Sequence, residues 1–148
     1  MQDLYDDQKV HVFRPFSGYG SSQALDYPFP SFIKRIKDKV DHFEIWGDGT
    51  QTRDFIHIND IVKATMRAVE LEIIKPINLG SGVATSFNQL FEKVVSVSGY
   101  NPRGGIKHLL DKPVGVHYRY SDPTLMNEFY KLSIDLETGI EMALNDLL

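Results

Sequence analysis

The stretch that decides the fold is Phe43–Asp60, which reads FEIWGDGTQTRDFIHIND. The apolar run Phe43–Trp46 predicts a strand, and Gly47-Asp48-Gly49 predicts a turn, because glycine adopts positive φ and aspartate bonds its own backbone. A second strand is predicted over Asp54–Ile58, so that the two strands form a hairpin. Asn59-Asp60 then predicts the N-cap of a helix.

Arg53 is placed by this pattern at the head of the second strand, beside the turn. Its planar guanidinium matches the geometry of a phosphate and could reach out of the fold toward one. The alternative is a surface arginine paired with Asp48 or Asp54.

The pattern Gly47-x-Gly49-x-x-x-Arg53-Asp54-Phe55-Ile56-x-Ile58-x-Asp60 resembles a signature in the second half of extended short-chain dehydrogenases, the NAD-dependent epimerase/dehydratase family. The likeness extends from Arg14 to about Leu144 and is nearest to members of the GDP-mannose 3,5-epimerase and UDP-galactose 4-epimerase types. It implies an α/β fold that supplies the C-terminal, nucleotide-sugar-binding lobe plus two strands of the Rossmann sheet, Val10–Phe13 and Ile77–Leu79. The N-terminal Rossmann half is expected to be absent.

Size and composition indicate one globular domain spanning residues 1–148, with a net charge of −4. The 16 Lys and Arg are scattered among 20 acidic residues, which argues against a nucleic-acid surface. No apolar run approaches the roughly 20 residues of a membrane span. The five histidines show no metal-ligand spacing, and the lack of cysteine excludes a thiolate site and suits a reducing compartment. We expect a cytoplasmic protein with no metal, nucleic-acid or membrane partner.

Strands alternate with helices along the rest of the chain, which is typical of an α/β protein. A loop is predicted over Arg14–Gly20, which holds one proline and two glycines, and an extended segment over Tyr27–Pro30. Capping residues predict helix starts at Ser86, Asp122 and Asp135. The helix expected from Ser31 buries Phe32, Ile33, Ile36 and Val40, and the helix expected from Asp60 buries Ile61, Thr65, Ala68 and Val69. The helix expected from Ser86 buries Leu90, Phe91, Val94 and Val95, and the helix expected from Asp135 buries Leu136, Ile140, Leu144 and Leu147. Further expected features are a helix end at Pro76, another at Gly99 and a strand over Ile106–Leu110.

The resemblance implies that Arg53 and Arg119 bind the diphosphate of the substrate. Arg119 lies in Gly115–Asp122, which resembles the family's late Arg-x-x-Asp element, whose aspartate caps the following helix. Two guanidiniums from separate segments suit two phosphates, because their bidentate forks fix orientation as well as charge. The alternative for Arg119 is an exposed side chain stacked on Tyr118 or Tyr120.

The segment Arg14–Gly20 resembles the family's Arg-x-x-Asn-x-Tyr-Gly segment, which passes between cofactor and sugar. The resemblance therefore places Pro15 and Phe16 against the cofactor and Ser17 against the substrate. Ser17 replaces the usual asparagine and offers one donor where an amide offers two, so its contact is weaker or bridged by water.

Trp46, which precedes the Gly47-x-Gly49 turn, and Phe32 are candidate contacts of the nucleotide base, although core packing is the default interpretation for each. Gly80-Ser81-Gly82 follows a strand but lacks the third glycine and the helix start of the dinucleotide fingerprint. A structural turn is expected there.

The family's chemistry requires a glycine-rich turn for the cofactor pyrophosphate and a Tyr-x-x-x-Lys pair. The sequence lacks the turn, and its one pair, Tyr5 with Lys9, is rejected because it abuts the strand predicted at Val10. Met1–Lys9 is interpreted as the tail of the helix that carries the true pair upstream. We expect NAD or NADP in the complete enzyme, but no tight cofactor binding and no catalysis by this chain alone.

Three hypotheses follow for a protein that recognises a UDP-, GDP- or dTDP-linked sugar. It is a fragment of an enzyme, a non-catalytic nucleotide-sugar-binding module, or one subunit of a split enzyme. Unpaired edges at Val10–Phe13 and Ile77–Leu79 would invite pairing with another chain. The first and third hypotheses therefore predict self-association or a partner carrying the N-terminal Rossmann half, and the second predicts a monomer.

Overall fold

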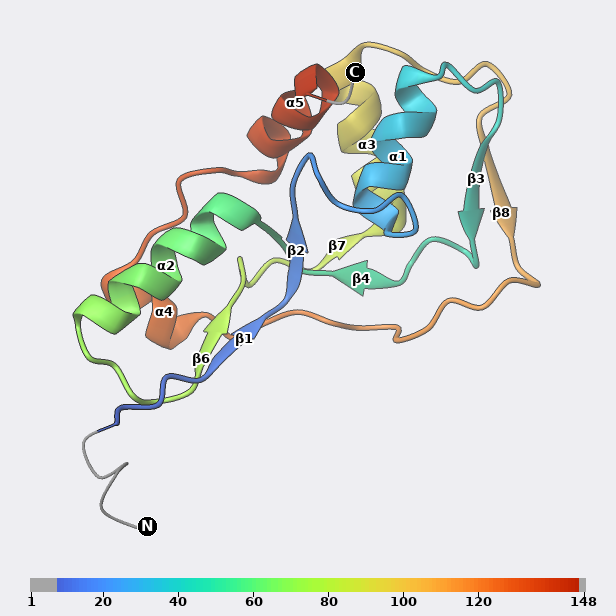
Figure 1. Ribbon diagram of the computed structural model, residues 1–148. Helices are drawn as coiled ribbons and strands as arrows, with labels where there is room; N and C mark the ends of the chain where they lie inside the picture. The colour runs from blue at the N-terminus through green and yellow to red at the C-terminus, as the bar shows by residue number, and fades with distance from the viewer. Residues whose placement is uncertain (1–7, 147–148) are drawn as a thin grey trace.

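The computed structural model describes residues 8–146 and confirms an α/β architecture (Figure 1). Helices α1, α3 and α5 pack together at one end, and α2 and α4 lie at the other (Figure 1). The elements in chain order are β1 (Phe13–Pro15), β2 (Ser17–Tyr19), α1 (Pro28–Lys37), β3 (Phe43–Trp46), β4 (Thr52–Arg53), β5 (Phe55–His57), α2 (Ile58–Glu70), β6 (Ile77–Leu79), β7 (Thr85–Ser86), α3 (Phe87–Ser98), β8 (Ile106–Leu109), α4 (Thr124–Phe129) and α5 (Leu136–Asp146).

The strands pair across long sequence separations rather than with their neighbours. β1 pairs with β6, β2 with β5 and β3 with β8, all in parallel, and β4 pairs with β7 antiparallel. The predicted hairpin between Phe43–Trp46 and Asp54–Ile58 is therefore wrong. Gly47 and Gly49 do turn the chain with positive φ, but the edge of β3 is taken by β8, starting from Phe43 opposite Ile106.

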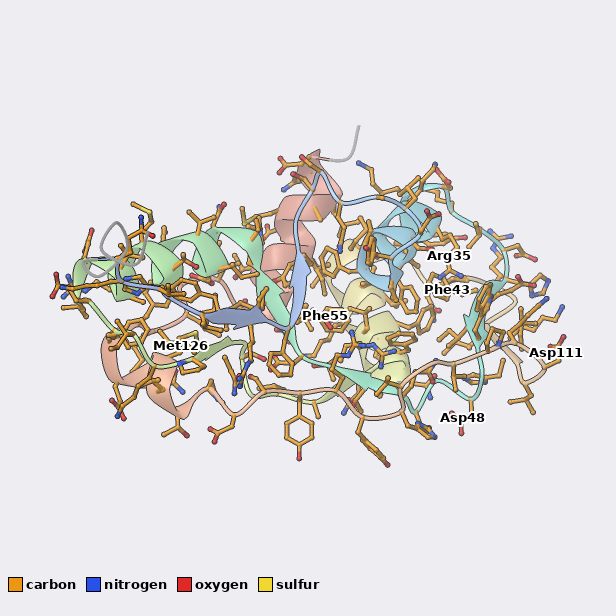
Figure 2. All side chains as sticks on the ribbon, turned by 60° about the horizontal axis from the view of Figure 1, so that its bottom comes forward. Arg35, Phe43, Asp48, Phe55, Asp111 and Met126 are labelled. Atoms are coloured by element: carbon orange, nitrogen blue, oxygen red, sulfur yellow. The ribbon has the colours of Figure 1, made fainter. Side chains whose placement is uncertain are left out.

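Two hydrophobic clusters form the core, and β5 contributes to both. Phe55 packs with the aromatic cluster among α1, α3 and α5, which includes Phe43, whereas its neighbour Ile56 packs with Met126 in the cluster beneath α2. Successive side chains of a strand point to opposite faces. The short strand β5 therefore contributes one side chain to each cluster and connects the two ends of the molecule. Figure 2 shows Phe55 between Phe43 and Met126.

The N-terminal strand is shorter and later than predicted. β1 begins at Phe13 instead of Val10, because only Phe13–Pro15 lie opposite β6, and Val10 is 69% exposed. The predicted loop Arg14–Gly20 instead holds the end of β1 and all of β2. Gly18 in β2 permits the close approach of Ile61 on α2, because a Cβ at this position would lie 2.8 Å from Cδ1 of Ile61.

Helix α1 begins earlier than predicted, at Pro28 instead of Ser31. Tyr27 is extended, as expected, with ψ of 147°, but Pro28–Pro30 are helical. Proline is tolerated in the first turn of a helix, where its missing N–H has no intrahelical acceptor. Phe32, Ile33 and Ile36 are buried as predicted, and Val40 is half-buried beyond the helix end.

Helix α2 departs from the prediction at both ends. It begins at Ile58, and its N-cap is His57, whose Nδ1 accepts the hydrogen bond of the Asn59 amide at 3.2 Å. Asp60 is not a cap but a buried residue of the first turn. The helix ends at Glu70, six residues before Pro76. Its buried residues are Asp60, Ala64 and Ala68, while Val69, predicted to be buried, is 46% exposed.

The capping predictions at Ser86 and Asp135 are confirmed, whereas the one at Asp122 is wrong, because α4 begins at Thr124 with Pro123 as its N-cap and Asp122 lies one residue earlier. Ser86 forms the capping box of α3, which ends at Gly99 in the left-handed conformation. The Asp122 carboxylate accepts the Thr124 amide at the start of α4 (3.0 Å), and that of Asp135 accepts the Thr138 amide of α5 (2.8 Å). The predicted inward faces of α3 and α5 are buried at Leu90, Phe91, Val94 and Ile140 and half-buried at Val95, Leu136 and Leu144. Leu147, and Tyr5 of the rejected Tyr-x-x-x-Lys pair, lie outside the described residues.

Candidate functional site

Two adjoining cavities are lined by residues of β2, α1, β3 and β4 and of the segments that connect them. The larger holds about 610 Å³ and is bordered by α1, β3 and the segment around Val114. The smaller holds about 330 Å³ and is bordered by β2 and the start of α1. Arg53, Tyr27 and Pro28 border both, so the cavities meet at the Arg53 side chain.

The Arg53 guanidinium is held from one side only. Its Nη1 donates to the carbonyls of Thr52 and Val116, each at 2.7 Å, and its carbon lies 5.5 Å from the centre of the Phe87 ring. Within residues 8–146 it pairs with neither Asp48 nor Asp54, so the alternative of a surface ion pair is contradicted. Within residues 8–146, Nε and Nη2 of Arg53 donate to no protein acceptor.

Arg119 borders the smaller cavity together with Arg53. Burial first, and then the positive charge of Arg119, lower the pKa of Arg53. The described structure shows no stacking of Arg119 on Tyr118 or Tyr120, since the Tyr118 ring stacks on His117 instead. No acidic side chain of the described chain lines this cavity, so two cationic groups lie together without a carboxylate between them. Such an arrangement favours an anion.

The segment carrying Arg119 is held beside β4 by hydrogen bonds on both sides of the arginine. The Thr52 amide donates to the His117 carbonyl at 2.8 Å, and the Ser121 amide donates to the Asp54 carboxylate at 2.9 Å. The sequence predicted that the two arginines converge but did not indicate the residues that bring them together.

Ser17 and Phe16 border the smaller cavity, whereas Pro15 is exposed on β1 and does not. The amide of Ser17 donates to the Asp54 carbonyl at 3.0 Å, which fixes β2 beside the arginines. Gln23 also borders this cavity, and sequence reasoning missed it because nothing in its local pattern distinguishes it.

Trp46 borders the larger cavity and is 53% exposed, so core packing is wrong for it. The alternation of β3 explains this, because Phe43 and Ile45 point inward and Trp46 outward. Phe32 also borders the cavity but is 4% exposed and packs edge-on against Phe43, so core packing holds for Phe32.

Two further residues of the larger cavity were not predicted. The Arg35 guanidinium lies 4.0 Å from the centre of the Phe43 ring, and burial lowers its pKa (Figure 2). Gln51 is 1% exposed and donates from Nε2 to the Trp46 carbonyl at 2.7 Å, which ties the turn after β3 to that strand. Both depend on tertiary contacts that the sequence pattern does not show.

The Gly80-Ser81-Gly82 turn has a structural role, as predicted. The amides of Ser81 and Gly82 donate to the two oxygens of the Asp54 carboxylate, at 2.7 and 3.1 Å, rather than to a ligand. Across residues 8–146 no group of three His, Asp or Glu side chains is arranged to hold a metal ion. None of the described helices is both long and apolar enough to cross a bilayer.

Comparison with known proteins agrees with this geometry. Residues 1–80 match the model of the NAD dependent epimerase/dehydratase family. The chain belongs to this family. Among its curated relatives, dTDP-4-dehydro-6-deoxy-D-allose reductase of Streptomyces bikiniensis is 34% identical over 137 residues, covering 89% of this chain and 41% of the relative. GDP-mannose 3,5-epimerase of Arabidopsis thaliana is 34% identical over 98 residues, covering 66% of this chain and 25% of the relative.

Solved structures of epimerase/dehydratase proteins share the fold. The UDP-glucuronic acid 4-epimerase of Bacillus cereus, in complex with UDP-glucuronic acid and NAD, has a TM-score of 0.80 and 27% identity, covering 94% of this chain and 45% of the enzyme. RMD of Pseudomonas aeruginosa, complexed with NADPH, shares the fold with a TM-score of 0.82 at 20% identity. The chain thus spans less than half the length of these relatives.

Proposed function

We propose that this chain is the nucleotide-sugar-binding part of an epimerase/dehydratase protein. Arg53 and Arg119 hold the diphosphate, Trp46 faces the base in the larger cavity, whose wall includes the core residue Phe32, and Ser17 faces the sugar in the smaller cavity. The observation that carries the proposal is the meeting of two cavities at an arginine with open donors. A nucleoside diphosphate sugar has the same order of parts, with its charge in the middle.

The charges support this arrangement. A hydrogen bond to a charged group contributes roughly 1.5–3 kcal/mol, and a guanidinium can form two such bonds to one phosphate. Arg53 is already fixed by the Thr52 and Val116 carbonyls, so little side-chain freedom is lost when an anion binds. The relatives support the ligand class, since those named above act on dTDP-, GDP- and UDP-linked sugars by their names.

The chain does not fit a dinucleotide as well as it fits the substrate. The amides of Ser81 and Gly82, which could cradle a pyrophosphate, are bonded to Asp54, and the sequence has no glycine-rich fingerprint. Phe16 alone of the two proposed cofactor contacts borders a cavity. In this proposal NAD or NADP, which supplies hydride transfer when bound, is not held tightly by this chain alone. The chain alone is therefore inactive.

A binding module without catalysis, or one subunit of a split enzyme, is the competing proposal. β1 and β6 pair with each other, so neither is left wholly unpaired, but Val10 and Val12 beside them remain 69% and 41% exposed. An analytical ultracentrifuge separates the hypotheses. Self-association supports a chain that needs a partner, whereas a monomer that binds nucleotide sugar supports the module. A cytoplasmic location remains a prediction from composition.

Titration with UDP, GDP and dTDP tests the ligand class. Trp46 is the single tryptophan, so its fluorescence reports occupancy of the larger cavity without a label. We expect saturable changes for at least one nucleoside diphosphate, and weaker binding by about tenfold or more for the corresponding nucleoside. Equal affinity for nucleoside and diphosphate would reject the arginine clamp.

A further inference from the structure

Asp54 is enclosed by hydrogen-bond donors although it faces neither cavity. Its side chain is 0% exposed. Oδ1 accepts the Ser81 amide (2.7 Å) and hydroxyl (2.6 Å), and Oδ2 accepts the Gly82 amide (3.1 Å) and the Ser121 amide (2.9 Å) and hydroxyl (2.5 Å). Five donors from two distant segments therefore converge on one carboxylate.

These donors connect the parts of the chain that border the smaller cavity. Asp54 follows Arg53 directly, and its carbonyl accepts the Ser17 amide at 3.0 Å. Ser121 lies two residues after Arg119. One aspartate, between β4 and β5, thus fixes the positions of two cavity segments, one through its carbonyl and one through its carboxylate.

The segment that carries Arg119 has no regular secondary structure, so its path depends on hydrogen bonds to other parts of the chain. Residues 110–123 form no helix or strand, and Tyr118 and Tyr120 are 70% and 56% exposed. Before Arg119, the Val116 and His117 carbonyls accept bonds from Arg53 and Thr52. After it, Ser121 donates to Asp54, and the Asp122 carbonyl accepts a bond from Asn78 at 3.1 Å. Of these, only the two bonds from Ser121 are made to a buried carboxylate, and such charge-assisted bonds are stronger than bonds between neutral groups.

We propose that Asp54 is a positioning residue for ligand binding, holding Arg119 beside Arg53 through Ser121. This inference rests on the proposed function, because it assigns to Arg119 a contact with the diphosphate. Asp54 itself does not touch the ligand. Both of its oxygens are already bonded to Ser81, Gly82 and Ser121 and to neither arginine.

A double-mutant cycle tests the inference, with the tightest binder among UDP, GDP and dTDP as the probe. Asp54→Asn turns one acceptor oxygen into a donor opposite other donors. We expect it to weaken binding by about fivefold or more, close to the effect of Arg119→Ala, and to add less than about twofold in the Arg119→Ala background. Full additivity of the two losses would overturn the proposal, because a merely structural aspartate affects both backgrounds alike.

Asp60→Asn is the matched control. Asp60 is also 0% exposed and accepts four hydrogen bonds, from Tyr130, Ser133 and Ile134, but none of these residues borders either cavity. This variant should leave the dissociation constant within about twofold of wild type wherever circular dichroism shows it folded. A loss equal to that of Asp54→Asn would contradict a specific role for Asp54.

A gentler pair keeps the test open if Asp54→Asn does not fold. Ser121→Ala and Ser81→Ala each remove one hydroxyl from the same carboxylate, but only Ser121 lies in the segment of Arg119. We expect about threefold weaker binding for Ser121→Ala and less than about twofold for Ser81→Ala. Equal effects of the two variants would contradict the proposal.

A measurement without ligand separates this inference from the proposed function. The chain has no cysteine, so a nitroxide can be placed at Arg119→Cys alone. Asp54→Asn should sharpen its electron spin resonance lines, and Asp60→Asn should not. Sharpened lines with no binding of any probe by the wild type would reject only the proposed function. If Asp54→Asn leaves the lines unchanged while the wild type binds nucleotide, only the inference is rejected.

Discussion

Asp54 and Asp60 are six residues apart, both fully buried and both surrounded by hydrogen-bond donors, yet they serve different parts of the molecule. Asp54 connects β5 to the segments around Ser81 and Ser121, beside the two cavities. Asp60 connects α2 to the chain between α4 and α5, which closes the end away from them. The same chemistry therefore stabilises the fold at one position and, by our inference, organises a binding site at the other.

Removal of the Asp60 carboxylate should destabilise the fold strongly. Asp60→Ala leaves the Ser133 and Ile134 amides and two hydroxyls without their acceptor, and an unsatisfied buried donor costs about 1–3 kcal/mol. We expect the free energy of unfolding in urea to fall by about 2–4 kcal/mol. A loss below about 1 kcal/mol would show that water replaces the carboxylate and that the comparison with Asp54 is unsound.

Acid should weaken the Asp60 connection. Burial alone would raise the pKa of Asp60, but hydrogen bonds from Ser133, Tyr130 and Ile134 outweigh it and hold the pKa below the ordinary value. A lowered folded pKa gives stability that is present above about pH 4 and is lost as the pH falls through the folded value. The gap in unfolding free energy between wild type and Asp60→Asn should therefore narrow below pH 4. A constant gap would contradict this assignment.

The smallest effect is expected at Trp46, which borders the larger cavity but is not connected to either aspartate by a side-chain bond within the described residues. Because the indole is 53% exposed, Trp46→Leu should change the free energy of unfolding by less than about 0.5 kcal/mol. Loss of a flat ring against the base should weaken nucleotide binding by about threefold to tenfold, measured by calorimetry. Unchanged affinity would place the base elsewhere.

Local chemistry made much of this fold predictable. The capping box at Ser86, the left-handed Gly99 and strand Ile77–Leu79 lie where the sequence placed them, because each depends on neighbouring residues. The predicted hairpin after Phe43 was wrong because tertiary packing decides which strands pair. Here β3 pairs with β8, which is distant in sequence, instead of with the nearby segment Asp54–Ile58.

The site was predictable only in part. The motif around Arg53 and the element at Arg119 indicated the two cations, and both border the smaller cavity. Neither indicated that Asp54, first considered as an ion-pair partner of Arg53, bonds Ser81, Gly82 and Ser121 instead. Those bonds span 27 to 67 residues of sequence, beyond the reach of any local pattern.

The most direct test of the central claim is the affinity of Arg53→Ala for the nucleoside diphosphate that the wild type binds best. Arg67→Ala is the matched control, since it removes the same charge from an exposed position on α2. We predict that Arg53→Ala weakens binding by about tenfold or more while Arg67→Ala changes it by less than about twofold. Equal affinities for wild type and Arg53→Ala would contradict a diphosphate site where the two cavities meet.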